Sequence, residues 1–336
     1  MNNSIYIVIP CYNEQEVLPE TAKRMKSKLE SLISSGKISA KSRIVFVNDG
    51  SKDRTWEIIS ELHKNDKIFS GINLSRNRGH QNALLAGLMT VKDLCDCDAA
   101  ISIDADLQDD INAMDEMIDK FLAGCDIVYG VRSKRDTDTF FKRFTAEGFY
   151  HVLKFMGAEI VFNHADYRLM SKRALNGLAD FKEVNLFLRG LVPMIGYSTD
   201  KVYYERSERF AGESKYSVKK MLALAAEGIT SLSVKPLKFI TFAGAACLAA
   251  ALCILIYGIA RTLSGEALSM TFAVLLSMWF IGGLTLVSLG IVGEYIGKIY
   301  MEQKNRPRFL VESFLHEHEH EHERKRECEC EHEEEL

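Results

Sequence analysis

The 336-residue sequence lacks the features that mark several common protein classes. Its net charge is −4, so basic residues are not in excess over acidic ones and we expect no nucleic-acid partner. No G-x-G-x-x-G follows the first apolar run and no G-x-x-x-x-G-K-[ST] occurs, which argues against a dinucleotide enzyme or a P-loop protein. The eight cysteines form no disulfide framework, and no signal peptide with a basic start is visible. We therefore expect the large N-terminal part to be cytosolic.

Two long segments without charge are present. Residues 239–260 and 267–293 contain 22 and 27 uncharged residues, and about 20 are enough to cross a bilayer. Because only a short turn separates them, the sequence predicts a transmembrane hairpin. Lys235 and Lys298 lie outside the hairpin, and the turn carries only Arg261. The positive-inside rule then predicts a multi-pass protein of the plasma membrane with both termini in the cytoplasm.

The first 130 residues alternate between short apolar runs and amphipathic stretches. The spacing predicts helices over residues 14–35, 53–65, 79–94 and 112–124. Five β-branched runs bounded by polar turns are predicted strands: 4–10, 42–49, 69–75, 99–104 and 126–131. This order predicts an α/β fold with a mostly parallel sheet and helices on both faces. Ligands of such folds bind beyond the carboxyl ends of the strands.

The stretch "ISIDADLQDD" (101–110) places four aspartates within seven positions at one such strand end. A hard divalent cation, Mg²⁺ or Mn²⁺, would relieve the repulsion between Asp104 and Asp106, and Gln108 adds a neutral oxygen ligand. An acidic turn without a metal has the same pattern, so this motif alone leaves both interpretations open. Polar motifs also end the other four strands: "IPCYNE" (9–14), "VNDGSKD" (47–53), "SRNRGHQNALLAG" (75–87) and "YGVRS" (129–133). Together they predict one continuous cleft.

These motifs, in this order, resemble family 2 glycosyltransferases of the dolichol-phosphate-mannose synthase and bactoprenol glucosyltransferase branch. The resemblance covers roughly residues 4–308, including the closing "GEYIGKIYMEQKNRP" (293–307). It implies a Rossmann-like GT-A domain that transfers one sugar from a nucleotide sugar to a polyprenyl phosphate. It also implies inversion at the anomeric carbon and supply of a lipid-linked sugar for cell-envelope glycosylation.

The resemblance also implies roles for individual residues. Asp104, Asp106 and Gln108 would hold the metal, and Asp166 would lie near the sugar. The expected contacts to the nucleotide sugar are Pro10, Tyr12, Glu14, Val47, Asp49, Asp104, Ala105, Asp106, Arg132, Arg209 and Lys215. Arg206 and Arg143 are the expected contacts to the lipid phosphate. Relatives commonly continue D-x-D-L-Q with prolines, whereas this chain has Asp109, Asp110 and Ile111, so the following helix is expected to start differently.

The predicted chemistry needs little general-base help, because a phosphate monoester is already largely ionised at neutral pH. The departing nucleotide diphosphate needs more stabilisation, which a divalent cation and basic side chains supply. Two other functions stay open at this point: a processive polysaccharide synthase and a non-catalytic membrane scaffold that binds sugar nucleotides. UDP-glucose, UDP-N-acetylglucosamine and GDP-mannose are all compatible donors, and the sequence leaves a homo-oligomer open.

The sequence thus predicts four parts. Residues 1–212 are the GT-A domain, 213–238 an interfacial amphipathic helix, 239–297 the two transmembrane helices (about 239–260 and 268–293), and 298–336 a cytoplasmic charged tail. The end of the tail, "HEHEHEHERKRECECEHEEE", cannot bury a core, so we expect it to be disordered. A weak zinc or nickel site formed by its histidines and by Cys328 and Cys330 is the less favoured alternative.

Overall fold

The computed structural model describes residues 3–133, 164–183, 187–205, 256, 259 and 270–316. The chain divides into two compact units. The first comprises residues 1–147, 160–216 and 307–336, and the second comprises residues 148–159 and 217–306. The sequence-based division ended the catalytic domain at residue 212 and assigned residues 298–336 to a separate tail.

The first unit is built on one eight-stranded sheet with the order β7-β5-β6-β4-β1-β2-β3-β8. All five strands and all four helices predicted within the first 132 residues are present, with ends that differ by a few residues. In chain order these are β1 (Ile5–Cys11), α1 (Leu18–Ser34), β2 (Arg43–Asn48), α2 (Thr55–Asn65), β3 (Phe69–Leu74), α3 (His80–Leu94), β4 (Ala99–Ser102), α4 (Ala113–Leu122) and β5 (Ile127–Arg132). The predicted α/β fold with a mostly parallel sheet is therefore confirmed.

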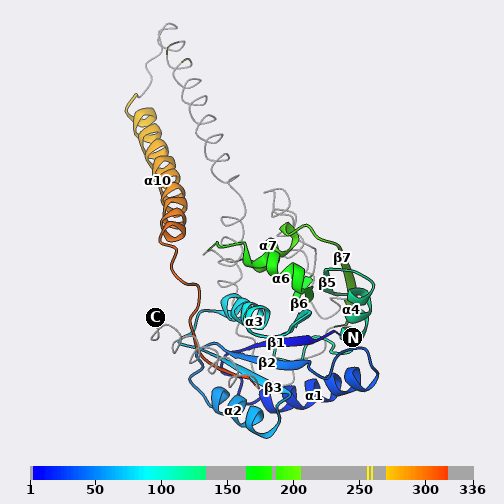
Figure 1. Ribbon diagram of the computed structural model, residues 1–336. Coiled ribbons are helices and arrows are strands. Elements are labelled where there is room, and N and C mark those ends of the chain that lie inside the picture. Colours follow the sequence, from blue (N-terminus) through cyan, green and yellow to red (C-terminus); the bar gives the residue numbers. More distant parts are fainter. Residues whose placement is uncertain are drawn as a thin grey trace, which may run out of the picture. The chain divides into compact units, whose positions relative to one another are not determined.

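Helices cover both faces of this sheet, as its alternating side chains require. Along β1, Ile5, Ile7 and Ile9 pack into the core beneath α1, α2 and α4, whereas Tyr6 and Val8 pack into the opposite core beneath α3. Side chains of successive strand residues point to opposite faces, so a strand that is apolar throughout has to be covered twice. Figure 1 shows α1 and α2 on one side of the strands and α3 on the other.

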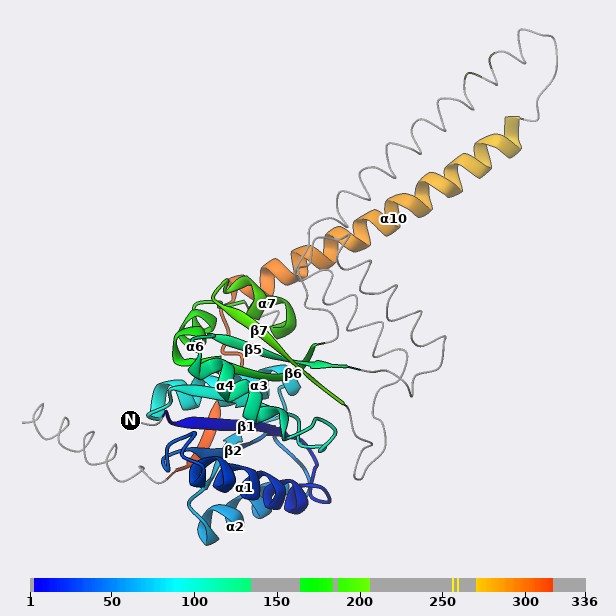
Figure 2. The same ribbon diagram turned by 90° about the vertical axis from the view of Figure 1, so that its right-hand side faces the viewer.

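Three further elements complete the sheet and its second face: β6 (His164–Ser171), α6 (Lys172–Ala179) and α7 (Leu188–Met194). β6 runs antiparallel between β4 and β5, with Ser102 of β4 paired with Arg168. Continuing this antiparallel register by two residues brings Asp166 beside Asp104, and the Ser102 hydroxyl donates a hydrogen bond to the Asp166 carbonyl oxygen at 2.6 Å. β7 (Thr199–Tyr204) then pairs in parallel with β5 and forms an edge strand of the sheet (Figure 2).

The other edge is closed by β8 (Val311–Leu315), which pairs antiparallel with β3. The sequence analysis placed these residues in the charged tail and did not predict a strand. His316, directly after β8, is buried, with its Nδ1 3.0 Å from the Ser70 hydroxyl and its ring stacked on Phe314. A five-residue strand that contains Glu312 and is followed directly by the charged tail has too weak a pattern to be recognised without its partner strand. The remaining tail, residues 317–336, lies outside the described residues.

In the second unit the structure describes mainly α10 (Met270–Gln303), a 34-residue helix. Apolar side chains such as Met278, Leu289 and Ile299 are largely exposed on it, and its last turns carry charged residues. Within the ranges that the structure describes, no helix combines the length and apolarity needed to cross a membrane. The predicted interfacial helix (213–238) and most of the first predicted span (239–260) lie outside the described residues.

Candidate active site

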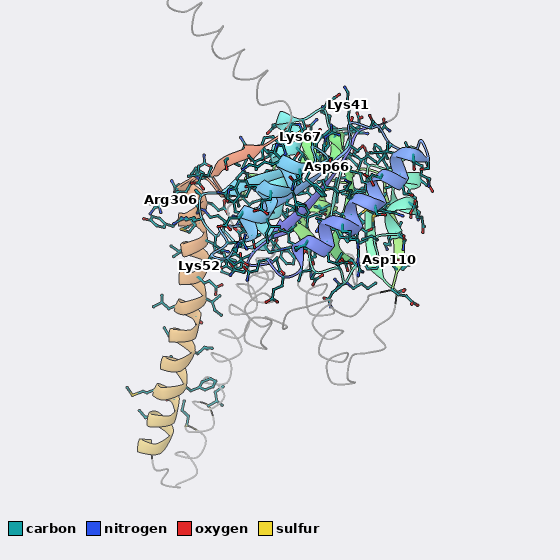
Figure 3. The ribbon with its side chains drawn as sticks, turned by 90° about the horizontal axis from the view of Figure 1, so that it is seen from below. Lys41, Lys52, Asp66, Lys67, Asp110 and Arg306 are labelled. Atoms are coloured by element: carbon teal, nitrogen blue, oxygen red, sulfur yellow. The ribbon has the colours of Figure 1, made fainter. Side chains whose placement is uncertain are left out.

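The strands β1–β5 all run in the same direction, so their carboxyl ends lie at the same end of the sheet. Figure 3 labels two side chains at this end, Lys52 after β2 and Asp110 after β4. Lys41 and Lys67, which precede β2 and β3, lie toward the opposite end of the strands. The predicted motifs at the strand ends are therefore neighbours in space.

The loops after β1 and β2 form the part of this end where the nucleoside is expected. Pro10 and Val47 are paired in the β1–β2 ladder and buried, so they shape the floor and contribute no polar group. Asn13, with a positive φ of 53°, joins the two loops: its N–H donates to the Ser51 hydroxyl at 3.0 Å, and its side-chain oxygen accepts from the Lys52 N–H at 2.8 Å. Tyr12 and Glu14, by contrast, are not buried and lie on the same β1–α1 loop.

Asp49, expected to contact the nucleoside, also holds the loop that leads into α3. Its two carboxylate oxygens accept the backbone N–H groups of Arg78 (2.7 Å) and Gly79 (2.9 Å). Burial raises the pKa of Asp49, although these hydrogen bonds oppose the shift. The loops after β2 and β3 approach so closely that a Cβ on Gly50 would lie 2.4 Å from the Asn77 backbone nitrogen.

The acidic motif after β4 turns sharply at Leu107, which has a φ of 56°. Within this turn the Gln108 N–H donates to Asp106 Oδ1 at 3.2 Å. Asp104 Oδ1 is buried and has no hydrogen-bond partner among the described residues. Burial raises the pKa of Asp104; His80 opposes that shift, and the charges of neighbouring aspartates reinforce it. A cation beside Asp104 would offset the cost of burying this carboxylate next to other aspartates.

The next aspartate, Asp109, has a different environment. Its Oδ1 accepts hydrogen bonds from the Tyr204 hydroxyl at 2.6 Å and from Arg132 Nη2 at 3.2 Å. The Asp109 side chain is 1% exposed, and the charge of Arg132 compensates the charge of this carboxylate inside the fold. Arg132, predicted to contact the donor phosphates, therefore directs part of its guanidinium at Asp109. The departure from relatives at Asp109 thus provides a buried link between the β4–α4 loop, β5 and β7.

Asp166 lies at the centre of a charged cluster. Its carboxylate contacts Arg168 Nη2 at 2.5 Å, Arg189 Nη2 at 3.1 Å and His80 Nε2 at 3.5 Å. His80 Nε2 is also 3.5 Å from Asp104 Oδ1. His80 therefore connects the metal motif to the acidic residue expected near the sugar.

The protonation states in this cluster follow from these contacts. Burial alone would raise the pKa of Asp166, but Arg189, His80 and Arg168 hold it well below its usual range. Burial would likewise lower the pKa of His80, whereas the hydrogen bond to Asp166 and the charge of Asp104 raise it to about 9. At neutral pH the cluster thus contains an ionised Asp166 and a protonated His80.

Asp104, Asp106, Gln108, Arg132 and Asp166 lie at the same end of the sheet, and their functional roles stay predictions. Arg143, Arg206, Arg209 and Lys215 lie outside the described residues and stay predictions. The sequence analysis did not single out His80, Arg168 or Arg189. His80 belongs to the quoted motif 75–87, which already marked its place at a strand end. The two arginines had no such signal, because only the antiparallel insertion of β6 and the packing of α7 direct them at Asp166.

Comparisons with known proteins agree with this arrangement. Residues 6–178 match the family model described as "Glycosyl transferase family 2". The chain is 47% identical over 310 residues to "Uncharacterized glycosyltransferase YkoT" of Bacillus subtilis (strain 168), covering 92% of this chain and 91% of that protein. It is 40% identical over 314 residues to "Bactoprenol glucosyl transferase" of Shigella phage SfX, covering 92% and 99%.

A more distant likeness exists to a solved structure of glucosyl-3-phosphoglycerate synthase from Mycobacterium tuberculosis in complex with Mn²⁺, UDP and glucosyl-3-phosphoglycerate. The identity is 14%, the TM-score is 0.41, and 68% of this chain and 78% of that chain are covered. No functional conclusion follows from a TM-score of this size. The match of the family model to half of the chain, and the identity to relatives over nine-tenths of it, are decisive. With the five predicted strand ends gathered around Asp104 and Asp166, they establish that this protein is a glycosyltransferase and belongs to family 2.

Proposed function

We propose that this protein transfers one sugar from a nucleotide sugar to a polyprenyl phosphate, such as undecaprenyl phosphate, with inversion of the anomeric carbon. The supporting observation is the convergence of Asp104, His80 and Asp166 at the carboxyl end of the sheet. It occurs in a chain that aligns over 92% of its length with a bactoprenol glucosyl transferase. UDP-glucose, UDP-N-acetylglucosamine and GDP-mannose are the candidate donors.

A divalent cation, Mg²⁺ or Mn²⁺, fits the acidic side of this site. Asp104 Oδ1 is buried without a hydrogen bond among the described residues, and the charges of Asp106 and Asp166 act on the same carboxylate, so this side of the site has negative charge that a cation would neutralise. Among the described residues no three His, Cys, Asp or Glu side chains form a ready-made metal cage. Mg²⁺ usually takes only one or two carboxylates and shares its other positions with water and substrate phosphates. We propose that Asp104, Asp106 and Gln108 hold the cation, which, when bound, neutralises charge on the departing nucleoside diphosphate.

The chain's own residues then have separate tasks. The paired loops after β1 and β2, with Tyr12 and Glu14, form the nucleoside end of the cleft. Asp166 stays ionised because three cationic groups surround it, so it acts as a fixed hydrogen-bond acceptor for a sugar hydroxyl. An acceptor phosphate is itself ionised at neutral pH, so the reaction requires no strong general base in the site.

We further propose that residues 239–293 hold the protein at the plasma membrane, with the catalytic domain and both termini in the cytoplasm. The support comes from the two uncharged segments of the sequence and from the apolar side chains exposed on α10. Such an anchor keeps the cleft near a lipid-borne acceptor. Membranes washed with alkaline carbonate should retain the protein, and a C-terminal protease site should be cut only after cells are opened.

The decisive experiment incubates membranes that contain the protein with radiolabelled nucleotide sugars, undecaprenyl phosphate and Mn²⁺ or Mg²⁺. We expect one donor to yield a lipid that carries a single sugar, identified by mass spectrometry. Asp106→Asn should reduce turnover by roughly a hundredfold or more, the usual effect of losing one strong electrostatic contact in a transition state. Asp96→Asn is the matched control, since the Asp96 side chain is 75% exposed and precedes β4, whereas the motif follows this strand.

Two outcomes would refute the proposal. A polymeric product would identify a processive synthase, and nucleotide-sugar binding without transfer of any tested sugar would identify a scaffold. An Asp106→Asn protein within about threefold of wild-type turnover would refute the assignment of the metal site alone.

A further inference from the structure

The two sides of the active-site cluster differ in charge. Asp104 and Asp106 belong to the acidic side, which has the character of a cation site. Around Asp166, two arginines, Arg168 and Arg189, contact one carboxylate. The two guanidinium charges exceed the single charge of the Asp166 carboxylate. Such a region attracts an anion.

The two arginines of this cluster are not equivalent. The Arg168 side chain is 1% exposed, so its guanidinium is enclosed by the fold and serves to hold Asp166. The Arg189 side chain is 36% exposed while it contacts Asp166 through Nη2 at 3.1 Å and Nε at 3.4 Å. Of the two arginines, Arg189 is therefore the one that combines a fixed orientation with access to a ligand from solvent.

The backbone that carries Arg189 is held by neighbouring elements. The N–H of Leu188, at the start of α7, donates to Gln81 Oε1 on α3 at 2.8 Å. The carbonyl oxygen of Leu188 accepts from Arg168 Nη1 on β6 at 3.4 Å. Leu188 and Leu191 pack into the same core as α3 and α6, and Figure 1 shows α7 close to α6. The position of Arg189 is therefore determined by the sheet and α3 together.

We propose that Arg189 binds the phosphate monoester of the acceptor, with Asp166 as the residue that positions its guanidinium. This inference rests on the proposed function, because it assigns the acceptor side of the same site. A guanidinium binds a phosphate through two parallel hydrogen bonds, which a planar group oriented from one side by a carboxylate is well placed to make. The donor diphosphate belongs to the acidic side, where a cation accompanies it. This assignment adds a contact within the described fold to the predicted lipid-phosphate contacts Arg143 and Arg206.

The test compares Arg189→Met, which removes the charge but keeps an apolar stem, with Arg189→Lys, which keeps the charge but loses the planar fork. Arg173→Met is the matched control: Arg173 lies on α6, is 68% exposed and stacks on Tyr197 away from the cluster. A fourth variant, Gln81→Leu, removes the anchor of Leu188 and leaves Arg189 itself unchanged. For each protein, KM for undecaprenyl phosphate, kcat, and the affinity for nucleoside diphosphate with Mn²⁺ are measured.

We expect Arg189→Met to raise KM for undecaprenyl phosphate roughly tenfold to a hundredfold, the usual range for losing a hydrogen bond between charged groups. Arg189→Lys and Gln81→Leu should give smaller increases, and Arg173→Met none. Nucleoside diphosphate affinity should stay within about twofold of wild type in all four variants. Farnesyl phosphate should inhibit the wild type more strongly than farnesol or inorganic phosphate, and Arg189→Met should lose the preference for farnesyl phosphate over farnesol.

The outcomes separate the inference from the function on which it rests. If the wild type forms no polyprenyl-phosphate-linked sugar, the proposed function is wrong. If the wild type forms it and Arg189→Met keeps the wild-type KM for the acceptor, only the assignment of Arg189 is wrong. A loss of nucleoside diphosphate affinity equal to the rise in acceptor KM would instead assign Arg189 to the donor. If Arg189→Met does not fold, Arg189→Lys and Gln81→Leu decide the question by the same measurements.

Discussion

Replacing Asp166 with asparagine should strongly destabilise the catalytic domain, in addition to any effect on catalysis. The Asp166 carboxylate lies 2.5 Å from Arg168 Nη2, and the Arg168 side chain is 1% exposed. Without the carboxylate, the buried guanidinium of Arg168 keeps its contact with the Leu188 carbonyl oxygen but loses the anion that compensates its charge. Removing one partner of a buried ion pair typically costs about 3–5 kcal/mol, because the remaining charge is not compensated.

This cost corresponds to a large change in melting temperature. For a domain of about 200 residues, 1 kcal/mol shifts Tm by roughly 2–4 °C, so Asp166→Asn should lower Tm by about 6–20 °C. Thermal unfolding of the detergent-solubilised protein, followed by circular dichroism, measures this shift. The control is Asp119→Asn, which removes a surface pair with Lys37 and should change stability by less than about 1 kcal/mol.

A double variant tests the physical reason. Adding Arg168→Met to Asp166→Asn removes the buried charge that the single variant leaves uncompensated, so the double variant should recover part of the lost Tm. If Asp166→Asn lowers Tm by less than about 2 °C, Arg168 is not held as a buried charge and the reasoning is refuted. A double variant less stable than Asp166→Asn would contradict it as well.

Three further predictions concern the loops, the charged cluster and the C-terminus. Gly50→Ala should lower the free energy of unfolding by about 2 kcal/mol or more, because φ is +61° and the new Cβ would lie 2.4 Å from a backbone nitrogen of the β3–α3 loop. It should also weaken nucleoside diphosphate binding, measured by calorimetry. The control is Gly36→Ala, with a φ of +72° but no atom within 4 Å of the new Cβ, which should cost about half as much stability and leave binding unchanged. His80, with its pKa raised to about 9, should stabilise the fold fully below about pH 6.5, the ordinary pKa of histidine, and lose this contribution as the pH rises through 9. The difference in unfolding free energy between wild type and His80→Asn should therefore shrink between pH 7 and 10, by about 1 kcal/mol because the side chain is 39% exposed. A difference that stays constant over this pH range would contradict the prediction. Deleting residues 317–336 should leave activity unchanged. Deleting residues 311–336 should lower Tm by several degrees, because it also removes β8 and the buried His316. Equal Tm values for the two truncated proteins would show that β8 does not stabilise the sheet.

Much of the first half of the fold follows from local pattern. The apolar runs of β1–β5 and the amphipathic repeats of α1–α4 are strong and regular, and the alternation of the two leaves a parallel sheet as the simple solution. Since the carboxyl ends of parallel strands lie at the same end of a sheet, the placement of Asp49 and Asp104 at that end was predictable from the order of the strands and helices alone. The family resemblance added Asp166, which no periodicity indicated.

The sequence by itself therefore determined the α/β class, the strands that carry the motifs, and the residue types suited to a cation and a phosphate. Only the tertiary structure decided how these residues combine. The antiparallel insertion of β6 brings Asp166 to Asp104, α7 directs Arg189 at Asp166, and β8 returns from beyond residue 306 to close the sheet. Asp109 and Arg132, which belong to motifs at two different strand ends, pair with each other. These contacts join residues tens to hundreds of positions apart, and their energies come from burial and charge compensation between elements, which no local window of sequence contains.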